Sequence, residues 1–266
     1  MPIKLDGVME TLLITLYARA KDAKSSHPVI KDKKAVEIME KIEYDFQKFE
    51  RGKMSYYGVL ARAKIMDEEV RRFISENPDC AIVSVGCGLD TRFFRVDNGK
   101  ILWYNLDFPE VIAQRELFFA PNERVKNISK SALDPAWTKE VVPNGRKLLI
   151  LSEGMLMYLK EEEVCRFLEL LTQGFDAFEA HFDLLYKGVV NKGRMHDTVK
   201  NTTAEFHWGV KDGSEVVALC PKLKQKGLIN FTKEMKHLLP GGTKLLIPLM
   251  YIVNNRLGMY TYQKES

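Results

Sequence analysis

A run of apolar, mostly β-branched residues that breaks into two glycines constrains this chain more than any other feature. The run covers Ala81–Val85, and Gly86, Cys87 and Gly88 follow it. Such a run is typical of a buried parallel strand, and the glycines predict a tight turn directly after it. Because glycine has no Cβ, the backbone of this turn can lie close to a ligand. The sequence therefore predicts an α/β fold with a binding site after this strand.

A second apolar run, residues 101–106, ends in Asp107. Nucleotide-binding α/β folds hold the ribose hydroxyls with an acidic residue about 20 positions after the glycine turn. The two features together predict a site for a small molecule that contains adenosine. A dinucleotide is disfavoured, because Thr91 stands where the dinucleotide pattern requires a third small residue. The sequence also lacks a phosphate-binding loop of the G-x-x-x-x-G-K-[ST] type.

Two stretches around these features match a known family. Residues 85–95, Val-Gly-Cys-Gly-Leu-Asp-Thr-Arg-Phe-Phe-Arg, and residues 106–112, Leu-Asp-Phe-Pro-Glu-Val-Ile, resemble the leucine carboxyl methyltransferase family. This group of S-adenosylmethionine-dependent enzymes includes O-methyltransferases of polyketide tailoring. Shorter matches are Ala61-Arg62, Ser152-Glu153-Gly154, Tyr158 and His207-Trp208-Gly209-Val210, so the resemblance covers roughly residues 50–264. It implies a Rossmann-like class I methyltransferase, with a mostly parallel seven-stranded sheet, helices on both faces and an N-terminal helical cap.

The resemblance also implies which residues hold S-adenosylmethionine and its product S-adenosylhomocysteine. The implied set is Arg62, Gly86, Cys87, Gly88, Asp90, Asp107, Phe108, Ser131, Ala132 and Glu153. In this set Arg62 grips the cofactor carboxylate with its planar guanidinium, and Asp107 accepts hydrogen bonds from the ribose. Phe108 covers the adenine, and Glu153 lies beside the amino group or the sulfonium.

Several of these residues also fit structural roles. The glycine turn can be an ordinary strand-to-helix connection, and Asp107 can cap the helix that follows it. Asp90 and Arg92 can form an ion pair that stiffens the loop. Where the family has an Asp-Leu pair that holds the adenine, this chain has Ser131-Ala132. A serine hydroxyl can still bond the adenine amine, so the adenine contact stays open at this point.

Direct displacement at a sulfonium requires alignment of the nucleophile and exclusion of water, so no catalytic triad is expected. The catalytic candidates are His181, His207 and Tyr57, the last in a predicted aromatic loop between Gly52 and Gly58. A histidine could act as general base toward a phenol, whereas a carboxylate acceptor is already ionised at neutral pH. We expect a small-molecule or peptide acceptor with a carboxylate or a hydroxyl group.

Strand and helix patterns alternate along the chain, which predicts one domain over residues 1–266 built from parallel βαβ units. The expected strands are residues 80–86, 101–107, 124–128, 147–152, 177–185, 226–232 and 259–263. The expected helices are residues 7–21, 34–49, 60–77, 161–173 and 244–254. We assign residues 1–78 to the helical cap, 79–186 to the cofactor-binding sheet, 187–226 to a lid over the substrate and 227–266 to the closing strands.

Composition is ordinary for a globular protein, with 45% hydrophobic and 29% charged residues. The net charge of +4 is spread along the chain, so no nucleic-acid partner is expected. The four cysteines lack metal-type spacing, and no apolar run has the length of a membrane span. These observations favour a cytoplasmic protein without a metal or a membrane partner, and they leave its oligomeric state open.

Three functions remain from the sequence. The leading hypothesis is an S-adenosylmethionine-dependent O-methyltransferase. The alternative is a non-catalytic sensor or scaffold of the same fold that binds S-adenosylmethionine or a nucleotide, which Ser131-Ala132 favours. A nicotinamide oxidoreductase is third, and Thr91 disfavours it.

Overall fold

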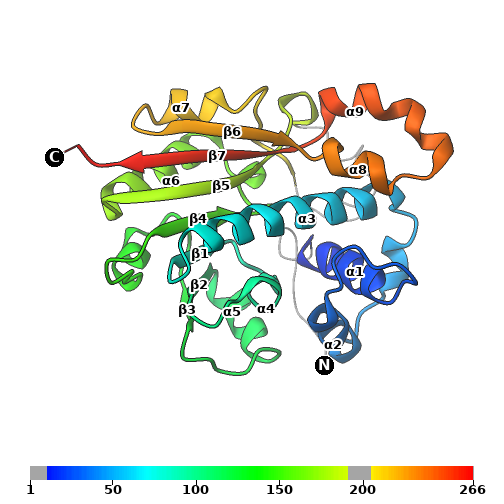
Figure 1. Cartoon of the computed structure of the whole chain (residues 1–266), viewed down its shortest axis with the longest axis horizontal. Helices are drawn as coiled ribbons and strands as arrows, with labels where there is room; N and C mark the ends of the chain where they lie inside the picture. Colours follow the sequence, from blue (N-terminus) through cyan, green and yellow to red (C-terminus); the bar gives the residue numbers. More distant parts are fainter. Residues whose placement is uncertain (1–10, 191–204, 266) are drawn as a thin grey trace.

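The computed structural model describes residues 11–190 and 205–265, which form a seven-stranded sheet with helices on both faces (Figure 1). The strands are β1 (Ala81–Val85), β2 (Leu102–Asp107), β3 (Val125–Ser129), β4 (Leu148–Ser152), β5 (Ala177–Leu184), β6 (Lys224–Asn230) and β7 (Arg256–Gln263). Their order in the sheet is β3-β2-β1-β4-β5-β7-β6, and β7 runs antiparallel to both of its neighbours. The mostly parallel, Rossmann-like sheet that the sequence predicts is therefore confirmed.

Both α-helices and 3-10 helices connect these strands or precede them. The α-helices are α1 (Thr11–Ala23), α2 (Lys33–Lys41), α3 (Lys53–Glu76), α4 (Arg92–Val96), α5 (Pro109–Glu116), α6 (Glu161–Gly174), α7 (Ser214–Leu219), α8 (Thr232–Leu238) and α9 (Ile247–Val253). The 3-10 helices are η2 (Phe46–Phe49), η3 (Pro135–Glu140), η4 (Leu156–Tyr158), η5 (Lys187–Val189) and η8 (Gly241–Leu246).

The central strands are buried on both faces, because helices cover each side of the sheet. On one face, Val70 of α3 packs in a cluster with Ile82 and Trp103. On the other face, Phe167 of α6 belongs to the cluster that contains Val83. Every residue of β1 and β4 is buried, which explains their continuous apolar sequences.

The N-terminal helices form a cap over the carboxyl edge of the sheet. Leu13 and Leu16 of α1 lie in one apolar cluster with Leu89, Met157 and Leu185. These three partners follow β1, β4 and β5, so the cap covers the edge where the parallel strands end. Figure 1 shows α1 beside the amino-terminal half of α3, and α2 packs against α1.

Two of the expected elements at the N-terminal end differ from the structure. The expected helix 34–49 is interrupted, because the backbone turns extended at Ile42 and Asp45 caps the separate helix η2. The expected aromatic loop between Gly52 and Gly58 is wrong, since α3 begins at Lys53. The part of the expected helix 7–21 before residue 11 lies outside the described residues.

The C-terminal elements differ mainly in their bounds. The expected helix 244–254 is divided into η8 and α9, with Pro248 in the first turn of α9. Strand β6 begins and ends two residues earlier than expected, and β7 begins three residues earlier. Of the expected lid, residues 191–204 lie outside the described residues, and the described part contains η5 and α7.

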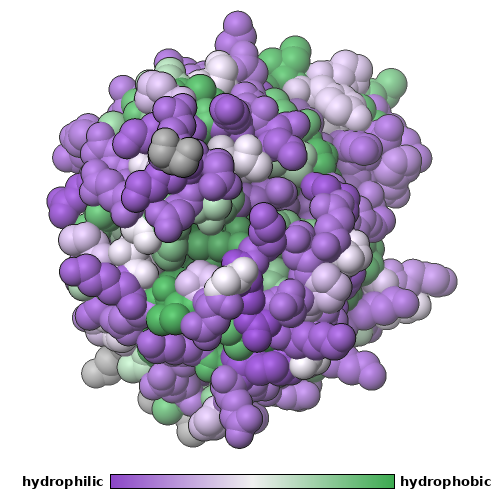
Figure 2. Space-filling view, turned by 60° about the vertical axis from the view of Figure 1, so that its left-hand side comes forward, coloured by the Kyte–Doolittle hydropathy of each residue, from purple (hydrophilic) through white to green (hydrophobic). Residues whose placement is uncertain are grey.

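Polar side chains cover most of the face shown in Figure 2, and hydrophobic side chains show through near its centre. Within the described part of the chain, no helix combines the length and the apolar character needed to cross a membrane.

Candidate cofactor site

The turn after β1 holds two glycines in backbone conformations that L-residues with a side chain rarely adopt. The φ angles are +67° at Gly86 and +46° at Gly88. The N–H groups of Gly86 and Cys87 donate to the carbonyl of Leu106 over 2.8 and 3.2 Å. The N–H of Gly88 donates to Oδ2 of Asp107 over 2.8 Å. The turn is thereby fastened to the end of β2.

A cavity of about 590 Å³ opens beside this turn, at the carboxyl edge of the sheet. It lies between the ends of β1 and β4, where the strand order reverses direction, which is the usual ligand position in open α/β sheets. Its volume falls within the range of about 300–1,000 Å³ for small-molecule sites. The predicted cofactor residues in its lining are Arg62, Gly86, Cys87, Asp90 and Glu153.

Asp107 and Phe108 lie at the end of β2 and are not among the described residues that line the cavity. Besides holding Gly88, Asp107 accepts the N–H of Phe108 on its Oδ1 over 2.8 Å. Burial raises the pKa of the Asp107 carboxyl above its usual value. Phe108 is the N-cap residue of α5, and its side chain is 51% exposed. The structure thus shows a turn-fastening role for Asp107 and leaves ribose binding a prediction.

Ser131 and Ala132 are also outside the described lining of the cavity. The hydroxyl of Ser131 accepts the N–H of Leu133 over 3.2 Å, and the carbonyl of Ala132 accepts Nε1–H of Trp137 over 3.1 Å. Both residues therefore shape the connection from β3 to η3, and their contact with adenine stays a prediction.

Under the glycine turn lies a network of buried charges that joins the cap to the sheet. Its arginines are Arg19, Arg62, Arg92 and Arg95, and its carboxylates are Asp32, Asp67, Asp90, Glu153 and Asp183. At its centre the Arg92 guanidinium, 1% exposed, contacts Asp67 over 2.7 Å, Asp90 over 2.8 Å and Glu153 over 2.6 Å. The predicted ion pair between Asp90 and Arg92 is confirmed.

Arg62 connects this network to the cavity. Its Nε lies 2.8 Å from Oε1 of Glu153, and its Nη1 donates to Oδ2 of Asp183 over 2.8 Å. The same Asp183 oxygen accepts the N–H of Gly154 over 3.1 Å, which fixes the turn after β4. Two carboxylates therefore orient the guanidinium in the cavity wall.

The ionisation of the acidic groups follows from these contacts. Burial alone would raise the pKa of Glu153, but the guanidinium groups of Arg62 and Arg92 hold it below its usual value. Burial raises the pKa of Asp183 above its usual value, although Arg62 opposes this shift. Glu153 is accordingly an anion in the cavity wall at neutral pH.

Helix α1 forms the roof of the cavity. A Cβ placed on Gly88 would lie 2.5 Å from Cδ2 of Leu12, so α1 lies directly against the glycine turn. Thr11, Thr15 and Arg19 of the same helix line the cavity. The amphipathic pattern of α1 indicated a cap, but nothing in it indicated which side chains face the site.

The structure also contributes site residues that the sequence analysis missed. Asp183 lies between the apolar residues Phe182 and Leu184 at the end of β5, and an acidic residue in this position could have singled it out. Met235 and Met250 reach the cavity from α8 and α9, far along the chain. No pattern in the sequence indicates that these methionines face a site instead of the core.

The catalytic candidates do not line this cavity within the described residues. His181 is completely buried in β5, with Nε2 2.9 Å from Oε1 of Glu179. His207 is exposed, and its backbone N–H donates to the carbonyl of Met157 over 2.8 Å. Tyr57 lines a second, smaller cavity near the start of α3. The described residues also contain no group of three or more His, Cys, Asp or Glu side chains that could hold a metal ion.

Comparison with known proteins agrees with this arrangement. The family model described as leucine carboxyl methyltransferase matches residues 12–172. The tetracenomycin polyketide synthesis O-methyltransferase TcmP of Streptomyces glaucescens is 30% identical over 223 residues, covering 84% of this chain and 82% of that protein. The S-adenosyl-L-methionine-dependent methyltransferase dpfgK of Gibberella zeae is 31% identical over 251 residues, with the same two coverages of 84% and 82%.

Solved structures share the fold at low sequence identity. A protein of Thermobifida fusca assigned as a methyltransferase superposes with a TM-score of 0.59 at 14% identity, covering 93% of this chain and 94% of that one. Magnesium protoporphyrin IX methyltransferase from Synechocystis PCC 6803, solved with bound S-adenosylhomocysteine, gives a TM-score of 0.52 at 7% identity. Its alignment covers 88% of this chain and 94% of that one.

Proposed function

This chain belongs to the leucine carboxyl methyltransferase family and is an S-adenosylmethionine-dependent methyltransferase, and from that premise we propose that it methylates an oxygen atom of its acceptor. The observation that carries the proposal is the cavity between β1 and β4, with Glu153 and Arg62 side by side in its wall. The printed name of the relative TcmP, an O-methyltransferase, supports oxygen as the accepting atom.

The charges in the cavity wall fit S-adenosylmethionine. Glu153 is an anion and complements the ammonium or the sulfonium of this cofactor. Arg62 offers its planar guanidinium, which lies in the cavity wall, to the cofactor carboxylate. Asp107 uses one lone pair on each oxygen for the turn, so its remaining lone pairs can accept the ribose hydroxyls.

The chain's own part in the reaction is positioning. The bound cofactor supplies a methyl group that its sulfonium already activates for displacement. Helix α1 covers the cavity and reduces the access of water, and the orientation of Arg62 by Glu153 and Asp183 fixes one end of the site. None of the described lining residues is a histidine, and this favours a carboxylate acceptor, which requires no general base.

Methyl transfer from S-adenosylmethionine tritiated in its methyl group to a panel of carboxylic acids, phenols, amines and thiols tests the proposal. Alkaline hydrolysis of the products separates the two classes of oxygen acceptor, because a methyl ester releases volatile labelled methanol whereas a methyl ether retains its label. We expect base-labile label in the products. Tight S-adenosylhomocysteine binding by calorimetry without transfer to any acceptor would instead support the sensor alternative. Label found only on nitrogen or sulfur would contradict oxygen as the acceptor.

A further inference from the structure

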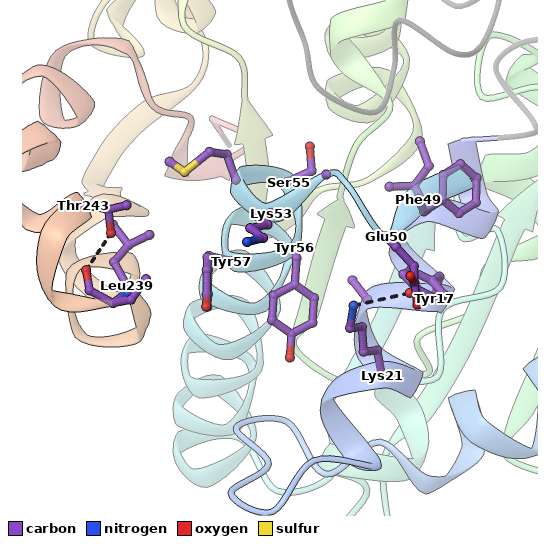
Figure 3. Close-up of a pocket in the computed structure, with 15 residues that line it drawn as sticks. Tyr17, Lys21, Phe49, Glu50, Lys53, Ser55, Tyr56, Tyr57, Leu239 and Thr243 are labelled. Atoms are coloured by element: carbon purple, nitrogen blue, oxygen red, sulfur yellow. Dashed lines mark hydrogen bonds between the residues drawn. The ribbon is translucent and has the colours of Figure 1, made fainter. Parts of the chain in front are cut away.

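A second cavity of about 290 Å³ adjoins the first. Helix α1, the start of α3 and the segment around η8 enclose it, and Figure 3 shows its lining. Ile14, Met54 and Ser55 line both cavities, so the two share a wall. A molecule in the smaller cavity therefore lies next to the candidate cofactor site.

Aromatic side chains from three elements form the walls of this second cavity. Tyr17 comes from α1, Phe49 from η2, and Tyr56 and Tyr57 from the start of α3. The Tyr56 and Tyr57 rings meet edge to face with their centroids 5.2 Å apart. Burial raises the pKa of Tyr56 to about 12, so its hydroxyl remains neutral near pH 7 and can donate a hydrogen bond. Flat rings of this kind favour a flat aromatic guest.

A lysine on α1 gives the cavity a positive group. Nζ of Lys21 lies 5.5 Å from the Tyr17 ring centroid and 5.7 Å from that of Tyr56, and it donates to the Tyr17 hydroxyl over 3.4 Å (Figure 3). Lys21 forms no ion pair with any residue of the described ranges. With Lys53 and Glu50 also in the lining, the charged lining residues sum to one net positive charge, from two lysines and one glutamate.

We propose that this second cavity is the acceptor subsite, and that it takes an aromatic acid with an anionic group remote from the methylated oxygen. The inference rests on the proposed function, since it assigns the acceptor of the same reaction. The aromatic ring packs among Tyr17, Tyr56 and Phe49, and the remote anion pairs with Lys21. The end of the acceptor that carries the methylated oxygen faces the side of the cavity that it shares with the cofactor site. A quaternary ammonium guest is disfavoured, because the ammonium of Lys21 already lies near both tyrosine rings.

Binding of two matched probes tests this assignment without relying on turnover. The probes are 2,6-naphthalenedicarboxylate, which has a carboxylate at each end, and 2-naphthoate, which lacks the second one. Affinities are measured by calorimetry on the full chain saturated with S-adenosylhomocysteine. We expect the diacid to bind roughly three- to tenfold more tightly than the monoacid, as one partly exposed charge-assisted contact allows.

The variant Lys21→Ala should abolish this difference in affinity, because it should weaken the binding of the diacid and leave the binding of the monoacid unchanged. Lys24→Ala is the matched control, because Lys24 follows the same helix and its Nζ pairs with Glu40 over 2.8 Å. Tyr56→Leu should weaken the binding of both probes, because it removes an aromatic ring from the cavity wall. Equal affinities of the two probes for the wild type, an equal effect of both lysine variants, or preferential binding of benzyltrimethylammonium would overturn the inference.

These outcomes are separable from those of the proposed function. Diacid binding that depends on Lys21, combined with no methyl transfer to any acceptor, would show that the second cavity binds aromatic acids but would refute the O-methyltransferase proposal and, with it, the cavity's role as an acceptor subsite. Methyl transfer to the acids with no effect of Lys21→Ala on diacid affinity would refute only the subsite.

Discussion

Replacement of Arg92 by methionine should destabilise the protein strongly, because three carboxylates lose a common partner. The guanidinium is 1% exposed and lies 2.6–2.8 Å from Asp67, Asp90 and Glu153. Removal of one partner from a buried ion pair costs roughly 3–5 kcal/mol. Each carboxylate keeps a second cation within 4 Å: Arg95 remains beside Asp67 and Asp90, and Arg62 beside Glu153. We therefore expect a loss of about 3 kcal/mol in the free energy of unfolding.

Urea unfolding followed by circular dichroism measures this loss. Arg72→Met is the matched control, because Arg72 contacts Glu69 over 2.7 Å and Glu76 over 3.3 Å but its side chain is 47% exposed. Exposed pairs contribute about 1 kcal/mol or less, so the control should change little. A loss at Arg92 no larger than that at Arg72 would refute the reasoning that burial makes this network essential.

The pH dependence gives an independent check on the same variant. Burial alone would raise the pKa of Asp90, but Arg92 and Arg95 hold it below its usual value. A carboxyl whose pKa is lower in the folded than in the unfolded protein stabilises the fold at pH values above its unfolded pKa of about 3.9. This stabilisation is lost as the pH falls toward the pKa of the folded protein. The variant lacks the part of this contribution that Arg92 supplies. The difference in the free energy of unfolding between wild type and variant should therefore become smaller as the pH falls below about 4. A difference that does not depend on pH would contradict the conclusion that Arg92 lowers the pKa of Asp90.

Three further variants test the turn and the cofactor site. Asp107→Ala should weaken S-adenosylhomocysteine binding by roughly 2–4 kcal/mol, and unchanged calorimetric affinity would remove Asp107 from the site. Gly88→Ala should destabilise the protein by roughly 1–3 kcal/mol, and the loss should be smaller in a Leu12→Ala background, where the side chain that the new Cβ would meet is shortened. Gly145→Ala is the control, because Gly145 also has a positive φ of +77° but no atom lies within 4 Å of an added Cβ. Arg62→Lys should weaken S-adenosylhomocysteine binding while 5′-methylthioadenosine, which lacks the carboxylate, keeps its affinity. Equal losses for both ligands would show that Arg62 acts through stability alone.

The backbone of the site could be predicted from the sequence because local rules control it. The apolar run Ala81–Val85 can only be a buried strand in this context, and a sharp turn at Gly86 and Gly88 requires the positive φ that glycine tolerates. Asp107 follows Gly88 by 19 positions, one crossover later, and the parallel pairing of β1 with β2 brings the two together.

The elements that the sequence analysis misplaced lack such local rules. No capping side chain marks the start of α3 at Gly52, so Tyr56 and Tyr57 resembled a loop. These residues are helical because α3 packs along α8, in the cluster that joins Tyr57 to Met235 and Leu239. Packing between distant segments decided this boundary.

The sequence by itself thus determined the fold class, the glycine turn and the candidate residues on it. Only the tertiary structure decided the partners of the charges and the walls of the two cavities. Arg62 and Asp183 are 121 positions apart, and Lys21 and Tyr56 come from different helices. Local patterns specify where a strand or helix forms, but a charged side chain can pair with any opposite charge that packing brings near it. The choice of partner is therefore a property of the folded chain.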